Sequence, residues 1–291
     1  MEIFKYSHSG NRTKLLKLLE GFGSFSYNAA SVLLRKGDIR VNGKKVYENV
    51  AVNDGDKLEV YGIMQTKPIV IYEDMNILAV YKRKGIKTDG GDGFESEIRG
   101  IEEYANVILC HRLDTNTDGI VLFAKDADAE KEIVAAFKAH KVEKKYIALV
   151  NGVFAHSGIQ KAYLSKNAEE GTAFVTGEYF KGSESIETRF ELVESFKGEG
   201  LSLLDITPIT GKTHQIRAHL KYLGYFIAGD GKYGDERINR RLRIAKQQLT
   251  AYKISFHFGE TSLLEYLNDK SIELKNPRSF IRIPADLRMN F

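Results

Sequence analysis

The sequence of 291 residues contains a single cysteine, Cys110, and therefore cannot form an intramolecular disulfide. Structural zinc sites need a full set of ligands, mostly cysteine and histidine, and no such cluster occurs along the chain. Cofactor-binding motifs are missing as well. We therefore expect that the protein uses neither a metal ion nor a cofactor.

Long apolar runs are also missing. A transmembrane helix needs about 20 mostly apolar residues, and no run approaches this length. Residues 1–10, MEIFKYSHSG, lack the apolar segment of a signal peptide. Hydrophobic residues still make up 43% of the chain, which is enough for a sizeable core. We expect a soluble, cytoplasmic protein with no membrane partner, and no protein partner is implied.

The net charge is uninformative by itself, because 43 Lys and Arg residues oppose 39 Asp and Glu residues. The positions of the charges say more. Between residues 12 and 45, two acidic residues accompany eight basic ones. The eight are Arg12, Lys14, Lys17, Arg35, Lys36, Arg40, Lys44 and Lys45. Two interpretations stay open for this stretch, a phosphate-binding face and an ordinary solvated helix face.

The same stretch has the pattern of a small folded unit. Its leucines predict a helix over residues 12–20. A second helix is predicted over residues 27–36, with Gly37 as its end. Asn42-Gly43 lies between two short apolar runs, and this dipeptide is the strongest short signal for a β-hairpin. The predicted inward side chains of the second helix are those of Ala30, Val32 and Leu33.

A larger unit follows a boundary that we place near residues 62–68. Residues 126–140 predict an amphipathic helix. Strand-like runs outnumber helices and occupy residues 68–72, 76–82, 107–111, 120–125, 145–150 and 254–258. Because strands and helices do not alternate regularly, the α+β class is favoured over a doubly wound parallel sheet. We predict a small α/β domain over residues 1–62 and a larger domain over residues 63–291.

The first candidate for chemistry is the polar segment HRLDTNTDG, residues 111–119, between two strand-like runs. A loop between core strands is a place where a rigid scaffold displays reactive groups. The charged or titratable residues of the segment are His111, Arg112, Asp114 and Asp118. A structural interpretation is also open, because Asp, Asn, Thr and Gly are common turn formers.

A second candidate is Arg217, which lies among largely apolar neighbours in PITGKTHQIRAHL, residues 208–220. A buried guanidinium requires a partner, and a carboxylate fits best. His214 and His219 are possible metal ligands, but no acidic or cysteine set completes such a site, which favours solvated or core histidines. The helix that begins here has two candidate N-caps, Thr210 and Thr213.

A second basic stretch follows the glycine-rich turn GDGKYG, residues 229–234, which lacks the spacing of a phosphate loop. Seven basic residues between positions 232 and 253 oppose two acidic ones, and tyrosines are interleaved. Basic and aromatic side chains together suit RNA, whose unpaired bases can stack. A charged surface helix fits equally well. The basic residues of interest are Arg240, Arg241 and Arg243.

Taken in order, these motifs resemble the RluA-type pseudouridine synthases. HRLDTNTDGIVLFAKD (111–126) is similar to the catalytic motif of that family, and KKYIALVNG (144–152) to its second motif. ITGKTHQIRAHL with GDGKYG (209–234) resembles the third motif. YEDMNILAVYKRKG (72–85) resembles the strand entry of the family, and IPADLRMNF (283–291) its C-terminus. The N-terminal unit resembles the RNA-binding domain named after the fourth small-subunit ribosomal protein.

This resemblance implies the pseudouridine synthase fold, a mixed, mostly antiparallel central sheet with flanking helices. It implies an isomerase that converts uridine to pseudouridine in RNA. Asp114 would be the essential carboxylate, acting by covalent attack or by proton removal. Arg217 would pair with Asp114, and Tyr146 would line the pocket against the base. The substrate-binding residues implied are His111, Arg112, Leu113, Thr213 and Gln215.

The resemblance also implies that RNA is the partner, with large-subunit rRNA the first choice and tRNA the second. The HRLD form, rather than GRLD, argues against the sister family that modifies small-subunit rRNA. The RNA-binding residues implied are Arg12, Lys14, Arg35, Lys36, Arg40, Lys44, Lys45, Arg240, Arg241 and Arg243.

The sequence departs from the family pattern at three positions. Asp118 stands where serine is usual, Thr250 replaces a frequent histidine, and Arg83 stands where a Lys-Pro pair is usual. Two rival functions stay open. One is a non-catalytic RNA-binding protein that keeps the fold, and the other is a hydrolase that uses Asp114 with His111 or His214.

Overall fold

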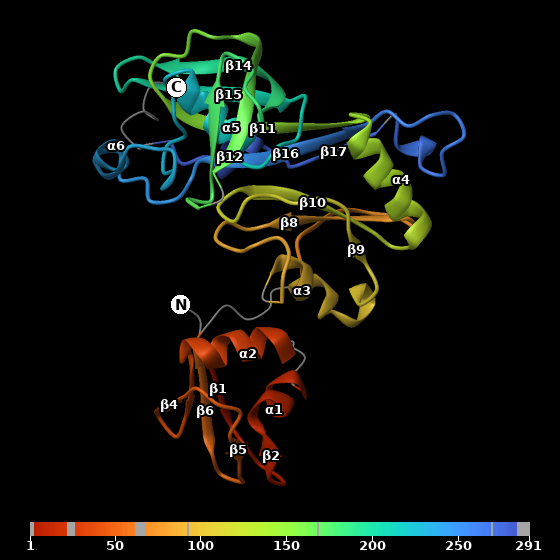
Figure 1. Cartoon of the computed structure of the whole chain (residues 1–291). Coiled ribbons are helices and arrows are strands. Elements are labelled where there is room, and N and C mark those ends of the chain that lie inside the picture. The colour runs from red at the N-terminus through yellow and green to blue at the C-terminus, as the bar shows by residue number, and fades with distance from the viewer. Residues whose placement is uncertain are drawn as a thin grey trace. The chain divides into compact units, whose positions relative to one another are not determined.

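The chain forms two compact units, each built from two separate segments of the sequence (Figure 1). The first unit comprises Met1–Ile69 and Lys87–Val107, and the second comprises Val70–Ile86 and Ile108–Phe291. The predicted boundary near residues 62–68 lies almost wholly outside the described residues, so the division at residue 62 stays a prediction. The computed structural model describes residues 3–21, 27–61, 68–91, 93–167, 169–268 and 270–283.

The first unit contains a four-stranded antiparallel sheet in the order β1-β6-β3-β4. Its hairpin between β3 and β4 is the one predicted at Asn42-Gly43. Both turn residues have positive φ, 51° and 78°, which matches the twist of the flanking strands. A separate strand pair joins β2 to β5. The strands are β1 (Ile3–Ser7), β2 (Thr13–Lys14), β3 (Ile39–Val41), β4 (Lys44–Val46), β5 (Ala51–Val52) and β6 (Lys57–Tyr61).

The helices of this unit follow the predicted pattern with two differences. The first helix starts at Leu15 rather than at residue 12, because Thr13–Lys14 pairs with β5 as a strand. In the second helix Leu34 is buried, whereas Val32 and Leu33, which were predicted to point inward, are half-buried. The helices are α1 (Leu15–Gly21), α2 (Tyr27–Lys36), α3 (Phe94–Arg99) and the 3-10 helix η1 (Glu102–Tyr104).

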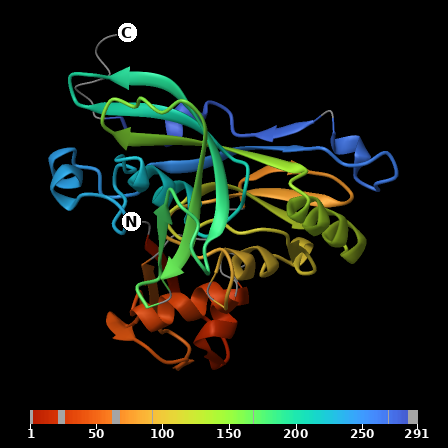
Figure 2. The ribbon, with the colours of Figure 1, turned by 45° about the horizontal axis from the view of Figure 1, so that its top comes forward.

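The second unit is organised around one large sheet, whose main path runs β13-β12-β14-β15-β11-β16-β10-β8-β7. Strand β17 also pairs with β16, and β9 with β10. Strands β12 and β14 are long and curve as they cross the unit (Figure 2). The strands are β7 (Val70–Glu73), β8 (Ile77–Lys82), β9 (Ile108–Leu109), β10 (Asp118–Ala124), β11 (Val142–Asn151), β12 (Gly158–Asn167), β13 (Thr172–Thr176), β14 (Glu184–Phe196), β15 (Leu201–Pro208), β16 (Leu249–Phe256) and β17 (Ser271–Glu273).

The helices of the second unit lie around this sheet. Asp126 begins the predicted amphipathic helix, because its carboxylate accepts a hydrogen bond from the backbone N–H of Ala129. Ala129 and Ile133 of this helix pack in the same core cluster as Ile120 and Leu122 of β10. The helices are α4 (Ala127–Lys138), α5 (Gln215–Tyr222), α6 (Glu236–Arg241) and the 3-10 helices η2 (Glu265–Leu267) and η3 (Pro277–Phe280).

Strand β10 fixes the position of the polar segment that precedes it. All seven of its residues are buried, and it pairs antiparallel with β8 but parallel with β16. Gly119 makes the parallel pairing possible. Its φ is 128°, and a Cβ at this position would lie 2.1 Å from the carbonyl oxygen of Ala251. The described pairs of this sheet are otherwise antiparallel, as predicted for a mixed, mostly antiparallel sheet.

Candidate active site

Asp114 lies in the connection between β9 and β10. The two strands pair at Leu109 and Phe123, and the backbone N–H of Thr117 donates to the carbonyl of Asp114 at 3.0 Å, closing a tight turn over residues 114–117. We call this segment the Asp114 turn. The Asp114 side chain is 24% exposed, so solvent and substrate can reach it. A partly exposed carboxylate is therefore held on a short connection between core strands.

Arg217 is the cation that this carboxylate contacts. Its side chain is 6% exposed, and Nη1 donates to Oδ2 of Asp114 at 2.9 Å across 103 residues of sequence. The buried arginine thus has the carboxylate partner that its apolar surroundings predicted. The contact with the guanidinium fixes the orientation of the Asp114 carboxylate.

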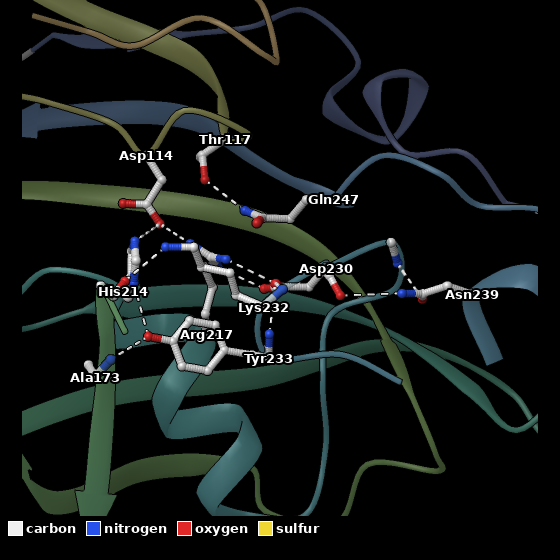
Figure 3. A network of polar contacts seen from close by, with 12 residues as sticks. Asp114, Thr117, Ala173, His214, Arg217, Asp230, Lys232, Tyr233, Asn239 and Gln247 are labelled. Atoms are coloured by element: carbon white, nitrogen blue, oxygen red, sulfur yellow. Dashed lines mark hydrogen bonds and ion pairs between the residues drawn. The ribbon is translucent and has the colours of Figure 1, made fainter. Parts of the chain in front are cut away.

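A second carboxylate, Asp230, holds the other side of the guanidinium (Figure 3). Nε and Nη2 of Arg217 donate to the two oxygens of Asp230 at 2.7 and 2.9 Å, a bidentate geometry. Burial would raise the pKa of Asp230, but Arg217 and the backbone N–H groups of Tyr233 and Lys232 outweigh it and lower the pKa. Asp230 was not predicted as a site residue, because GDGKYG suggested only a turn. The sequence feature that could have indicated Asp230 is an aspartate between two glycines, 13 residues after the arginine that needs a carboxylate partner.

His214 and Tyr233 lie next to the group formed by Asp114, Arg217 and Asp230 (Figure 3). His214 precedes α5 with a φ of 57°, and its Nε2 lies 3.8 Å from Oδ2 of Asp114. Its Nδ1 lies 2.9 Å from the hydroxyl of Tyr233, which accepts from the backbone N–H of Ala173. The Tyr233 hydroxyl therefore links His214 to the backbone of Ala173 in β13. Burial lowers the pKa of His214, although the charge of Asp114 opposes this.

Tyr146 and Lys144 lie two residues apart on β11, and therefore on the same face of the strand. Burial and the charge of Asp114 raise the pKa of Tyr146, so the phenol stays protonated. Burial lowers the pKa of Lys144 to about 8, and the charge of Asp114 opposes this effect. The Lys144 ammonium also lies 5.4 Å from the centre of the Phe137 ring. Lys144 was not predicted as a site residue, because two adjacent lysines on a strand suggest a solvated edge.

The geometry combines an oriented carboxylate, a buried guanidinium and a protonated phenol, and the comparison with known proteins identifies the family. Residues 76–222, about half of the chain, match the model of the RNA pseudouridylate synthases. The chain belongs to this family. Membership confirms the predicted enzyme class, an isomerase that forms pseudouridine in RNA.

Curated relatives resemble this synthase over most of its length. Ribosomal large subunit pseudouridine synthase C of Vibrio parahaemolyticus is 31% identical over 269 residues, covering 84% of this chain and 82% of the relative. The protein of the same name from Escherichia coli is 30% identical over 233 residues, covering 72% of each chain. The family predicted from the ordered motifs is therefore confirmed.

Two solved structures share the fold of this synthase. Human RNA pseudouridylate synthase domain containing 1 superposes with a TM-score of 0.62 at 23% identity, covering 77% of this chain and 94% of that chain. Human RNA pseudouridylate synthase domain containing 4 gives a TM-score of 0.59 at 20% identity, covering 72% of this chain and 89% of that chain. These likenesses confirm the predicted α+β class with a mixed, mostly antiparallel sheet.

The structure gives Gln215 of the synthase a role other than the predicted substrate contact. Its amide nitrogen donates to the carbonyl of Glu187 and the hydroxyl of Thr188, at 3.0 and 3.1 Å. Its amide oxygen accepts from the hydroxyl of Thr210 and the backbone N–H of Lys212. With its hydrogen-bonding capacity filled, Gln215 fixes the loop before α5 against β14.

Other predicted residues around α5 and the Asp114 turn differ in their surroundings. The residue that precedes α5 is His214 without a side-chain cap, so the predicted capping by Thr210 or Thr213 is wrong. Thr213 is exposed. His111 accepts from the backbone N–H of Leu122 through Nε2, and burial lowers its pKa to about 3. Its ring supports the loop, because it packs 5.1 Å from the ring of Phe137.

Two further predicted residues, Arg112 and Leu113, come just before Asp114 in the chain. Leu113 is buried and Arg112 is exposed, so the segment before the Asp114 turn presents an apolar side chain inward and a cation outward. Within the residues that the structure describes, no group of three His, Cys, Asp or Glu side chains is suited to hold a metal ion. Over the same residues, the helices are too short or too polar to cross a membrane.

The basic residues predicted to bind RNA are mostly exposed in both units. In the first unit Arg40 is the exception, because it is half-buried with its guanidinium 4.6 Å from the centre of the Tyr61 ring. Lys45 lies opposite Arg40 on the β3–β4 hairpin, and α2 ends with two exposed cations. In the second unit Arg240 pairs with Glu236 at 2.6 Å on α6. The exposed residues are Arg12, Lys14, Arg35, Lys36, Lys44, Lys45, Arg240, Arg241 and Arg243.

Proposed function

We propose that this synthase isomerises specific uridines to pseudouridine in large-subunit ribosomal RNA, in the cytoplasm. The single observation that carries the mechanism is the 2.9 Å contact of the partly exposed Asp114 carboxylate with the buried Arg217. The choice of RNA is supported by the names of curated relatives that are about 30% identical and act in the large ribosomal subunit. Transfer RNA is the alternative substrate.

The reaction makes an isomer, so it consumes no water, oxidant or reductant. The bond between uracil N1 and ribose C1′ breaks, and a bond between C5 and C1′ forms. C5 loses a proton, and N1 gains one. Asp114 would act by covalent attack or by removing a proton, and both routes need an ionised, oriented carboxylate. Arg217 orients the carboxylate, and Asp230 keeps the guanidinium in place from its far side.

The predicted substrate contacts can be assigned to particular tasks. Tyr146 and Leu113 are buried near the carboxylate and would form pocket walls against the base. Arg112 is exposed beside them and would occupy the space that a flipped nucleotide leaves in its helix. His111 and Thr213 stay predictions as substrate contacts.

Substitution of Asp114 by asparagine tests the catalytic assignment. We expect Asp114→Asn to abolish tritium release from RNA labelled at uridine C5, because an amide neither attacks a sugar or base nor removes a proton. Binding of the same RNA should stay within about three-fold of wild type, since one contact among many is altered. Substantial residual release would reject Asp114 as the essential group. A wild-type protein that binds RNA without any release would instead support the silent RNA-binding rival.

The basic residues of the first unit, within the domain predicted over residues 1–62, would neutralise RNA phosphates. We expect the triple variant Arg35→Ala, Lys44→Ala, Lys45→Ala to weaken RNA binding and to flatten its salt dependence. The slope of log affinity against log salt should fall by about 0.7–0.9 for each phosphate that the variant no longer neutralises. A matched control is Glu48→Ala in the same unit, which should leave the slope unchanged. Equal slopes for the triple variant and wild type would exclude these residues from the RNA interface.

A further inference from the structure

A second carboxylate, Asp118, lies four residues after Asp114 and is 3% exposed. The hydroxyl of Thr250 donates to its Oδ1, and the hydroxyl of Tyr81 donates to its Oδ2, both at 2.7 Å. The ammonium of Lys84 lies 3.5 Å from Oδ1. A buried carboxylate is costly unless it is hydrogen-bonded and paired with a cation, and Asp118 has both kinds of partner.

These partners of Asp118 come from three different segments. Tyr81 belongs to β8, Lys84 to the turn after β8, and Thr250 to β16. Asp118 itself begins β10, which pairs with both of these strands, in parallel with β16 at Thr250. One side chain therefore joins β8, β10 and β16 at the point where the chain leaves the Asp114 turn.

The rest of the Asp114 turn is held from the same strands and their extensions. Gln247, two residues before β16, donates through Nε2 to the hydroxyl of Thr117 at 2.8 Å, close to Asp114 (Figure 3). The backbone N–H of Gly85 and the ammonium of Lys82 donate to the carbonyl of Thr115 at 2.8 and 3.3 Å. These contacts hold Thr115 and Thr117 on either side of the turn. The start of β10 at Asp118 therefore helps to set the direction of the Asp114 side chain.

We propose that Asp118 is a positioning residue for catalysis, which fixes the end of the Asp114 turn so that the Asp114 carboxylate stays in contact with Arg217. This inference rests on the proposed role of Asp114. The contact with Thr250 joins a buried carboxylate to its hydroxyl donor across the parallel pairing of β10 with β16.

The test replaces Asp118 with asparagine, which keeps the shape and removes the charge, and Thr250 with valine, which removes one donor. We expect Asp118→Asn to lower kcat by about ten-fold or more while KM for RNA stays within two-fold, because small displacements of a catalytic group are costly and the RNA contacts are untouched. Thr250→Val should lower kcat less. The double variant should lose little more than Asp118→Asn alone, because both changes act on one contact.

Asp205→Asn is the matched control. Asp205 also accepts a tyrosine hydroxyl, that of Tyr252 at 2.5 Å, and lies 3.8 Å from the ammonium of Lys145, but these partners lie outside the Asp114 turn. We expect this variant to keep kcat within two-fold of wild type. An equal loss of kcat in Asp118→Asn and Asp205→Asn would overturn the proposal, because destabilisation alone would then explain it. Unchanged kcat in a folded Asp118→Asn protein would overturn it too.

A crystal structure of Asp118→Asn separates this proposal from the proposed function. The distance between Asp114 Oδ2 and Arg217 Nη1, 2.9 Å in the wild-type chain, should increase beyond hydrogen-bonding range. An unchanged distance would overturn the positioning role even if the synthase acts on another RNA. Failure of Asp114→Asn to lose activity would reject the proposed function, while the crystallographic result for Asp118 would stand by itself.

Discussion

The two ends of one short turn carry two aspartates with opposite surroundings. Asp114, at the start, is 24% exposed and contacts the guanidinium of Arg217. Asp118, just after the end, is 3% exposed and is enclosed by Tyr81, Thr250 and Lys84. Three residues separate a partly exposed carboxylate from a buried one.

This difference shows how the same side chain can serve chemistry at one position and hold the fold together at another. A carboxylate with free oxygen lone pairs and access to solvent can bind or attack a substrate. A carboxylate whose oxygens are occupied by hydroxyls and a cation can only hold its neighbours in place. The same distinction applies to Arg217, which contacts the accessible Asp114 on one side and the buried Asp230 on the other.

The largest effect should come from removing Arg217, the cation that Asp114 and Asp230 of the candidate active site share. Arg217→Met leaves Asp230 buried without its ion-pair partner, and we expect a loss of about 3–5 kcal/mol in the free energy of unfolding. Urea denaturation would measure it. As a control, Arg240→Met breaks the exposed pair with Glu236 and should change stability by less than about 0.5 kcal/mol. A loss below about 1 kcal/mol for Arg217→Met would mean that Asp230 is stable without its cation.

Local patterns predicted much of the fold. Residues 27–36 form the predicted helix, which contains Ala, Leu, Arg and Lys as good helix formers and ends before Gly37, a glycine with positive φ. Asn42-Gly43 forms the predicted turn. These features depend on neighbours in sequence. The start of the first helix was predicted three residues too early, because Thr13–Lys14 pairs with β5, a partner almost forty residues away. Strand pairing between such distant segments cannot be predicted from the residues next to each strand.

The residues of the candidate active site also differ in how well the sequence predicted them. Asp114 and Arg217 could be identified from ordered motifs, and the structure brings them together across 103 residues. Asp230 and Lys144 could not be identified from the sequence. Asp230 lies in a glycine-rich turn and Lys144 lies beside a second lysine, and neither pattern indicates that the side chain is buried. Gln215 was predicted to touch substrate, yet its amide is filled by protein partners. Hydrogen-bond satisfaction depends on the completed fold.

A smaller effect should follow from removing one donor to the enclosed carboxylate. Tyr81→Phe keeps the ring, which packs 5.3 Å from that of Phe280, and removes only the hydroxyl that donates to Asp118. We expect a loss of about 1.5–3 kcal/mol in the free energy of unfolding, typical of a hydrogen bond to a charged group. Tyr266→Phe is the control, because its hydroxyl donates to Asp74 at a more exposed site. Equal losses for the two variants would show that enclosure adds nothing to the Asp118 contact.

The smallest effect on stability should come from the residue with the largest effect on activity. Asp114→Asn keeps an amide oxygen that can still accept from Arg217, and Arg217 retains its bidentate contact with Asp230. The side chain is also partly exposed, so little desolvation is involved. We expect urea denaturation to show a change within about 1 kcal/mol while tritium release is abolished. A loss as large as that of Arg217→Met would place Asp114 with the structural carboxylates, and the contrast between the two ends of the turn would no longer hold.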